Sequence, residues 1–434
     1  MANRGEQGRG EQDRGEQDRG EQGRGEQDYK TLTLTALRQL CKDRGLKGYS
    51  GLNKARLIQL LSSTSATALV ESEFVLQPMI TYIGNKRKLV PWIMEIVEEI
   101  SLKLGGRRLA AFDGFGGSGV VSRALMSKCS ILHSNDMEYY SFVLLKCFLE
   151  TPTNEQRARI SDHFDEMDIL RDIASDTGFV SELYAPKNTA AVEADERCFY
   201  TRENATIIDT LLNYISGVEE DIKCYLLGPL LIKASINVNT AGVFRGFYKK
   251  DGVGHFGGAA ENALERILAP IELVQPIWSS SSCVCKCYNS DINNLITTFK
   301  DGELDVIYLD PPYNEHPYGS NYFMLNLIAR GQAPTEYSKV SGIPKFWNKS
   351  AFNGRGTAYD TMLDLLRNCL MKARYTLVSY NNEGLVTEED WNRIFLELGC
   401  EVKMYQKEYD TYHGSRNLGD RNKKVVEILY RISR

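Results

Sequence analysis

Apolar and polar positions divide the chain into three stretches of different character. Residues 4–28 hold no large apolar side chain. Residues 29–64 carry leucines at the three- and four-residue spacing of amphipathic helices. From residue 79 onward, short apolar runs that read as buried strands are followed by turns and helix starts. Strands that alternate with helices are typical of a parallel sheet covered by helices, so the pattern predicts a tail, a small helical unit and a large α/β domain.

The first stretch consists of five consecutive pentapeptides at residues 4–28, each Arg-Gly-Glu-Gln followed by Gly or Asp. Because it has no apolar side chains to bury, nothing offsets the entropy lost on ordering it. We therefore expect residues 1–28 to be a disordered tail. Five Arg are outnumbered by five Glu and three Asp, a net charge of −3. This charge favours a solvated tail over an arm that touches nucleic acid.

Residues 29–64 predict two short helices joined by a turn. Thr33 or Thr35 can cap the first helix, and a Gly-x-x-Lys-x-x-Leu-Ile run at 51–58 lies in the second. Seven Lys and Arg against one Asp give residues 29–61 a local charge of +6. This charge favours contact with the DNA backbone, and a protein-docking pair of helices is the alternative.

The leucine pattern and the Gly-x-x-Lys-x-x-Leu-Ile run resemble the SAP module, a helix–loop–helix unit that binds DNA. We take Lys54 and Arg56 of the SAP-like module at 29–64 as candidate DNA-binding residues. The Ser-, Thr- and Ala-rich residues 65–78 predict a linker to a catalytic domain at 79–434.

The composition is that of an ordinary globular protein, with 42% hydrophobic and 25% charged residues. No apolar run approaches the roughly 20 residues that span a bilayer, and the start MANRGEQGRG lacks the apolar segment of a signal peptide. We therefore expect an intracellular protein with no membrane partner. Ten Cys in 434 residues indicate free thiols and not a disulfide framework. The net charge of −5 hides a local +4 in residues 403–434, so nucleic acid could contact defined faces.

A glycine-rich motif begins the chemistry of the large domain. The run LAAFDGFGGSGVVSRAL, from Leu109 to Leu125, predicts a strand, a tight turn and the start of a helix. The glycines let the backbone approach a ligand, and the helix start offers N–H groups. About twenty residues later, CSILHSNDMEYY predicts a second strand ending at Asp136, a position that commonly binds ribose hydroxyls. A helix-capping Asp is the alternative, but the two motifs together favour an adenosine-containing cofactor.

The most specific motif is Asp310-Pro311-Pro312-Tyr313, which follows the apolar strand Val306–Leu309. Open α/β sheets bind ligands at the carboxyl ends of their strands. The two prolines fix the backbone and remove N–H donors, so carbonyl groups in the turn stay free as acceptors. A carboxylate, a carbonyl and an aromatic ring together suit a flat heterocycle that bears an amine. These four residues are therefore the catalytic candidates.

The motifs resemble, in kind and in order, the Dam-like, alpha-ordered group of site-specific DNA adenine-N6 methyltransferases, over residues 79–434. The resemblance implies an α/β, Rossmann-like methyltransferase fold, a largely parallel sheet closed by an antiparallel hairpin, and a mostly helical target-recognition insert at about 150–285. It implies S-adenosylmethionine as cofactor, double-stranded DNA as partner and no metal. The residues that it implies for cofactor binding are Tyr82, Gly84, Asn85, Lys86, Asp113, Phe115, Gly117, Gly119, Asp136, Asp291 and Asp310. The family usually has Pro where this chain has Gly114, which predicts a looser turn.

The resemblance also implies the reaction. A flipped-out adenine would donate hydrogen bonds from its amine to Asp310 and to the Pro311 carbonyl and would stack on Tyr313, while its N6 accepts a methyl group. We expect such an enzyme to act as a monomer, and restriction protection, marking of viral DNA and epigenetic regulation all fit it. Cytosine-N4 methylation is the close alternative, although Asp before Pro-Pro-Tyr favours adenine. A catalytically silent DNA-tethering protein is the other, against which the intact motifs argue.

Specific DNA contacts are expected in the run NVNTAGVFRGFYKKDGVGHFGG, where basic residues can grip phosphates and aromatic rings can wedge or stack near the extruded base. Its candidates are Arg245, Lys249 and Lys250, with Phe244, Phe247 and Tyr248. A glycine-rich surface loop with ordinary charges is the alternative. Arg416, in HGSRN, is a weaker candidate for a phosphate contact.

The run CVCKC at 283–287 has a one-residue spacing that suits one face of a strand and not a zinc knuckle. The five His show no ligand spacing either. We therefore expect strand thiols and no metal site.

Overall fold

The computed structural model describes residues 32–43, 54, 57–58, 74, 77, 79–258, 261–410 and 424–434. The chain forms two compact units, Met1–Leu76 and Gln77–Arg434. In the first unit, helix α2 (Leu34–Asp43) begins after Thr33, whose hydroxyl accepts a hydrogen bond from the Ala36 N–H at 3.2 Å. The expected disordered tail at 1–28, the turn between the predicted helices and most of the predicted linker lie outside the described residues.

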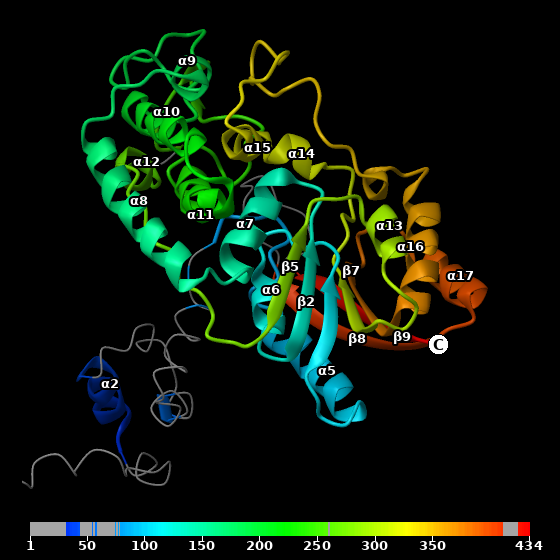
Figure 1. Cartoon of the computed structure of the whole chain (residues 1–434). Helices are drawn as coiled ribbons and strands as arrows, with labels where there is room; N and C mark the ends of the chain where they lie inside the picture. The colour runs from blue at the N-terminus through cyan, green and yellow to red at the C-terminus, as the bar shows by residue number, and fades with distance from the viewer. Residues whose placement is uncertain are drawn as a thin grey trace, which may run out of the picture. The chain divides into compact units, whose positions relative to one another are not determined.

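A seven-stranded sheet in the order β5-β2-β1-β6-β7-β9-β8 forms the centre of the second unit (Figure 1). Its strands are β1 (Leu109–Asp113), β2 (Cys129–Asn135), β5 (Val284–Tyr288), β6 (Leu304–Leu309), β7 (Ala373–Asn381), β8 (Glu401–Asp410) and β9 (Lys424–Ser433). In the sheet order, the strands from β5 to β7 are parallel to one another, whereas β9 runs antiparallel between β7 and β8. The prediction of a largely parallel sheet closed by an antiparallel hairpin is confirmed.

Helices cover both faces of this sheet. Helices α5 (Val90–Lys103), α6 (Val120–Leu125) and α7 (Tyr139–Leu149) lie on one side, and α13 (Ile292–Leu295), α16 (Ala358–Lys372) and α17 (Glu388–Leu398) lie on the other (Figure 1). The chain passes from β1 outward to β2, and from β6 outward in the opposite direction to β7. Right-handed crossovers then place the helices on opposite faces, and the sheet has its topological switch point between β1 and β6.

The segment between α7 and β5 is mostly helical, as predicted. It holds α8 (Asn154–Asp172), α9 (Phe179–Leu183), α10 (Arg202–Ser216), α11 (Glu220–Ile236), the hairpin β3 (Lys249–Lys250) and β4 (Val253–Gly254), and α12 (Leu264–Leu268). Thr153 and Thr201 cap α8 and α10 with side-chain hydrogen bonds. Buried apolar side chains of α8, α10 and α11 share one core with α7 and with α15 (Phe323–Arg330).

All of the run CVCKC except Cys283, which directly precedes the strand, falls in β5 at one edge of the sheet, so the prediction of a strand there is confirmed. The Sγ atoms of Cys283 and Cys285 are 3.9 Å apart, and both residues are free thiols. Across the described ranges, no cluster of His, Cys, Asp and Glu could hold a metal ion. Nor does any helix within them have the length and apolar character needed to cross a membrane.

Candidate active site

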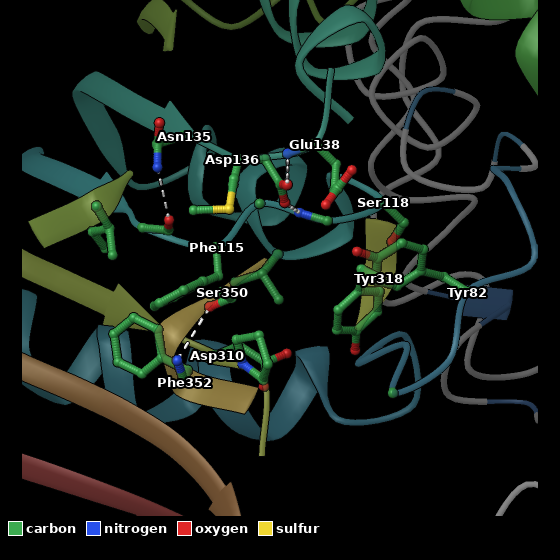
Figure 2. Close-up of a pocket in the computed structure, with 18 of the residues that line it drawn as sticks. Tyr82, Phe115, Ser118, Asn135, Asp136, Glu138, Asp310, Tyr318, Ser350 and Phe352 are labelled. Carbon is green, nitrogen blue, oxygen red and sulfur yellow. Dashed lines mark hydrogen bonds between the residues drawn. The ribbon is translucent and has the colours of Figure 1, made fainter. Parts of the chain in front are cut away.

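A pocket lies at the carboxyl ends of β1, β2 and β6, next to the switch point (Figure 2). It holds about 870 Å³ of space free of protein atoms, part of it open to solvent. Ten of the site residues predicted from the sequence line the pocket: Tyr82, Gly84, Asn85, Lys86, Phe115, Gly117, Asp136, Asp291, Asp310 and Pro312. Four other predicted site residues are not part of the lining: Asp113, Gly119, Pro311 and Tyr313. The pocket thus joins segments from across the second unit.

The glycine-rich turn forms one wall of the pocket. Gly117 and Gly119 adopt φ values of +53° and +78°, in the left-handed region that favours glycine. A Cβ atom on Gly117 would stand 3.0 Å from the Tyr82 ring. Asp113 lies behind the turn and accepts a hydrogen bond from the Ser122 hydroxyl at 2.6 Å, while burial raises its pKa to about 7. In this position Asp113 can stabilise the glycine-rich turn without lining the pocket.

Gly114 is closely packed, and the looser turn expected from its replacement of Pro is not seen. A Cβ atom there would stand 2.2 Å from the Cδ1 atom of Ile292 and 2.8 Å from the Cδ2 atom of Leu309. The Asn135 side-chain amide also donates a hydrogen bond to the Gly114 carbonyl at 3.2 Å. The Ile292 side chain therefore fills the space that a larger residue at 114 would need.

Two carboxylates line the pocket beside this turn (Figure 2). The oxygens of Asp136 accept hydrogen bonds from the backbone N–H groups of Gly117 at 2.7 Å and Glu138 at 2.8 Å. Burial raises the pKa of Asp136, and it raises the pKa of Glu138 to about 7 despite a hydrogen bond from the Asn326 amide at 2.5 Å. Sequence reasoning named Asp136 and missed Glu138, although both lie at the end of the same strand.

Asp310 lies in a buried chain of ionic contacts. The Lys86 Nζ atom is 3.1 Å from one Asp310 oxygen and 2.8 Å from an oxygen of Glu427 on β9, and Glu427 also accepts a hydrogen bond from the Ser379 hydroxyl at 2.7 Å. Burial alone would lower the pKa of Lys86, but the two carboxylates hold it well above its ordinary value. For Asp310, burial outweighs the attraction of Lys86 and raises the pKa to about 6. Lys86 is therefore charged and held between the two acids.

Aromatic rings hold the segment that carries Lys86. The rings of Tyr82, Tyr318 and Tyr322 pack together in a triangle, with the Tyr82 centroid 5.0 Å from each of the other two and those two 6.0 Å apart. The Ile83 N–H donates a hydrogen bond to the Tyr322 hydroxyl at 2.7 Å, and the Tyr318 hydroxyl donates one to the Ile83 carbonyl at 3.2 Å. These contacts fix the start of the segment, so the position of the lysine is set by packing.

Tyr313 lies near this cluster. Its ring meets that of Tyr380 edge-on with centroids 6.2 Å apart, and the Lys86 ammonium lies 5.8 Å from its centroid. Its hydroxyl lies 3.3 Å from where a Cβ atom of Gly84 would stand. Because Tyr313 belongs to the Asp-Pro-Pro-Tyr corner but not to the lining, a ring stacked on it would lie outside the pocket itself.

The opposite end of the pocket is apolar. The rings of Phe115 and Phe352 meet edge-on with centroids 5.3 Å apart, and Ile292 lies beside them in the lining. Phe352 comes from the 3-10 helix η2 (Ala351–Asn353), which follows a long loop after α15. The sequence analysis missed this loop, because a polar run such as NKSAFN carries no local sign that it reaches a site formed by other segments.

The residues predicted to bind DNA differ in how exposed they are in the structure. Arg245, Lys249 and Lys250 are exposed, the two lysines on the β3–β4 hairpin. Phe244 is only 1% exposed and packs against Tyr322, so the idea that it wedges into DNA is wrong. In the first unit, Lys54 is exposed. Arg56 and Arg416 lie outside the described residues.

The doubly wound sheet, the glycine-rich turn and the acidic corner at the switch point define a Rossmann-like methyltransferase. Residues 82–351 match the family of D12 class N6 adenine-specific DNA methyltransferases, and the chain belongs to this family. It is 30% identical over 331 residues to the type II methyltransferase M.CviAII of Paramecium bursaria Chlorella virus 1, an alignment that covers 74% of this chain and 90% of that protein.

Two further relatives extend this similarity. The type II methyltransferase M.NlaIII of Neisseria lactamica is 28% identical over 353 residues, which cover 79% of this chain and 95% of that protein. The modification methylase StsI of Streptococcus sanguinis is 28% identical over 370 residues, which cover 81% of this chain. The alignment takes in only 52% of the StsI methylase, so the chain corresponds to about half of that longer protein.

Proposed function

We propose that this protein transfers a methyl group from S-adenosylmethionine to the N6 atom of a flipped-out adenine at specific sites in double-stranded DNA. Family membership gives the reaction class and the DNA substrate. The observation that carries the residue assignment is the Asp310 carboxylate, held by a buried lysine at the mouth of a pocket suited to a nucleoside. Cytosine-N4 methylation remains the alternative outcome of the test below.

The pocket fits S-adenosylmethionine in shape and in charge. The apolar end at Phe115, Ile292 and Phe352 suits an adenine ring, and Asp136 and Glu138 can accept hydrogen bonds from ribose hydroxyls. When bound, S-adenosylmethionine supplies a methyl group on a positively charged sulfur. An acidic lining favours a ligand of that charge over a neutral one.

Asp310 orients the nucleophile in this proposal. An adenine amine shares its lone pair with the ring, so it is a weak nucleophile. Hydrogen bonds from the amine to the Asp310 carboxylate and the Pro311 carbonyl favour a nitrogen whose lone pair points at the methyl carbon. S-adenosylmethionine would supply the methyl group and leave as a neutral thioether; the positive charge that develops on the amine nitrogen would be stabilised by the fixed Asp310 carboxylate, to which the methylated amine would then lose one proton. The ring of Tyr313 replaces part of the stacking that the base loses.

Lys86 is a positioning residue in this scheme. Its ammonium holds one oxygen of Asp310 at 3.1 Å, which leaves the other oxygen to receive the amine. Glu427 on β9 holds Lys86 from the opposite side, and the Ser379 hydroxyl on the neighbouring strand β7 donates a hydrogen bond to Glu427. Lys86 keeps the carboxylate ionised near neutral pH, because it opposes the rise in the pKa of Asp310 that burial and Glu427 cause.

The test is methylation of DNA from a methylation-deficient host with labelled S-adenosylmethionine, followed by nucleoside analysis and sequencing of modified sites. The expected product is N6-methyladenine at one short sequence, and Asp310→Ala should abolish it while DNA binding is retained. The matched control is Asp301→Asn, an exposed carboxylate that pairs with Lys372 at 2.8 Å and should leave turnover unchanged. N4-methylcytosine as the only product would contradict the base assignment, and near-normal turnover of Asp310→Ala would contradict the role of that residue.

A further inference from the structure

The loop formed by residues 337–349, between α15 and η2, is folded back on itself. Tyr337 and Pro344 form an antiparallel β-bridge, and the Ser338 N–H donates a hydrogen bond to the Ile343 carbonyl at 2.8 Å. In Figure 1 the chain between α15 and α16 extends beyond α14 (Tyr318–Asn321) and α15. Residues 337–349 therefore form a defined loop that projects from the end of the sheet where the pocket lies.

Both ends of the 337–349 loop are anchored. The Arg197 guanidinium donates a hydrogen bond to the Lys339 carbonyl at 2.8 Å, and the Tyr184 hydroxyl donates one to the Gly342 carbonyl at 2.8 Å. Near the other end, the Asn348 side chain donates a hydrogen bond to the Met137 carbonyl at 3.0 Å and lines the pocket. The loop thus connects the helical insert to the rim of the active site.

The 337–349 loop exposes apolar surface that the second unit leaves uncovered. Phe346 is 76% exposed and Val340 is 70% exposed. Within the described ranges, Phe346 is the only phenylalanine or tryptophan whose side chain is mostly exposed. Phe346 and Val340 thus expose two apolar side chains on one short loop that reaches the rim of the pocket, a surface that a bound partner could cover.

Charge and position identify DNA as that partner. Lys339 and Lys349 are exposed on the loop and no acidic residue lies within residues 337–349, whereas the third lysine, Lys345, pairs with the Glu336 carboxylate at 2.7 Å, one residue before the loop. Phe346 is two residues from Asn348, so their Cα atoms are at most about 7 Å apart. Arg197 holds this loop, and the next residue, Cys198, contacts the Tyr248 carbonyl at 3.9 Å, directly before the Lys249–Lys250 hairpin. Both basic segments are therefore fastened to the same point of the insert.

We propose that the 337–349 loop grips the duplex beside the target base and that Phe346 occupies the gap left in the base stack when the adenine turns outward. This proposal rests on the proposed function, because it requires a flipped base. An apolar wedge offsets part of the cost of unstacking the base, and Lys339 and Lys349 on either side neutralise nearby phosphates. The sequence suggested that the aromatic residues at 244–248 could wedge into the DNA. This proposal assigns the wedge to Phe346, in a different segment.

The experiment compares wild type with Phe346→Ala on two duplexes that share the site found by the methylation assay. One duplex is fully paired, and the other has an abasic position opposite the target adenine, which removes most of the cost of flipping. Phe346→Ala should lower kcat/KM about tenfold or more on the paired duplex, and the loss should largely disappear on the abasic duplex. Phe346→Trp should retain activity on both. Fluorescence of 2-aminopurine at the target position should rise on binding to wild type and much less on binding to Phe346→Ala.

The matched control is Leu396→Ala on α17, which removes another highly exposed apolar side chain, at 84% exposure, and should change neither rate. Cofactor affinity measured by calorimetry should be the same for Phe346→Ala and wild type. Unchanged activity of Phe346→Ala on the paired duplex, or an equal loss on both duplexes, would overturn the wedge while leaving the proposed function intact. Absence of methylation by the wild type on every duplex would overturn the proposed function and the wedge with it.

Discussion

Replacement of Asp310 by asparagine should abolish methyl transfer and at the same time stabilise the protein at neutral pH. The carboxylate has an ordinary pKa of 3.8, which burial raises to about 6 in the folded protein. A group whose folded pKa lies above its unfolded pKa destabilises the folded state once it is ionised. The difference between the two pKa values corresponds to about 3 kcal/mol, an upper value because this side chain is one-fifth exposed.

The sign of the effect fixes its pH window. Below pH 4 the carboxyl group is protonated in both states and costs nothing. Between pH 4 and 6 the unfolded chain loses its proton first, so the folded wild type loses stability, and above pH 6 the full cost is present. Asp310→Asn carries no charge at any pH. Its advantage over wild type should therefore be greatest above pH 6, shrink as the pH falls through 6, and disappear near pH 4.

The assay is urea-induced unfolding at pH 7.5 and pH 5, followed by tryptophan fluorescence. All four tryptophans lie in the unit Gln77–Arg434, so the signal reports on the catalytic unit. The control is Asp301→Asn, where ion pairing with Lys372 lowers the pKa of the carboxyl group, so that neutralisation should bring no gain. If Asp310→Asn is no more stable than wild type at pH 7.5, then ionised Asp310 does not lower the free energy of unfolding, and the reasoning is refuted.

Three further outcomes are expected. The kcat of the wild type should fall as the pH drops through about 6, the pKa of Asp310. Glu427→Gln should shift this fall to lower pH, because Glu427 raises the pKa of Asp310. A pH profile of kcat that is the same in Glu427→Gln and wild type would contradict the assignment of the fall to Asp310. Gly117→Ala should weaken cofactor binding about tenfold in calorimetry, because a Cβ atom at a φ of +53° meets the Tyr82 ring at 3.0 Å; unchanged affinity would show that the turn can shift. Lys250→Gln should weaken DNA binding and reduce the slope of log affinity against log salt by about 1, and an unchanged slope would exclude a phosphate contact.

The parts of the site that the sequence could predict are those built from one continuous segment. Asp310 follows an apolar strand and precedes two prolines, so its place at the end of β6 follows from local pattern. Glu427 could not be assigned in the same way, because its contact with Lys86 depends on how β9 pairs with β7. The signal that was present is a single acid within the apolar run VVEILY, since a buried charge needs a partner.

The same limit explains the residues that cover the pocket. Phe352 and Asn348 lie in a polar loop after α15, and nothing in their local sequence shows where that loop returns. Gly114 shows the opposite case, in which a local rule gave the wrong expectation. The replacement of a family Pro by Gly suggested a looser turn, but Ile292, from a distant segment, fills the space. Packing between distant segments decided both outcomes.

The charges that line the pocket bear on the proposed reaction. Asp136, Glu138, Asp291 and Asp310 line it together with a single cation, Lys86, among its described lining residues. Burial raises the pKa of Asp136, Glu138 and Asp310, so ionising these carboxyl groups inside the pocket costs free energy. In the proposed reaction, a methyl donor with a positively charged sulfur would offset this cost, whereas the demethylated product, with a neutral sulfur, would not. Under that proposal the acidic lining would favour binding of the donor over binding of the spent cofactor.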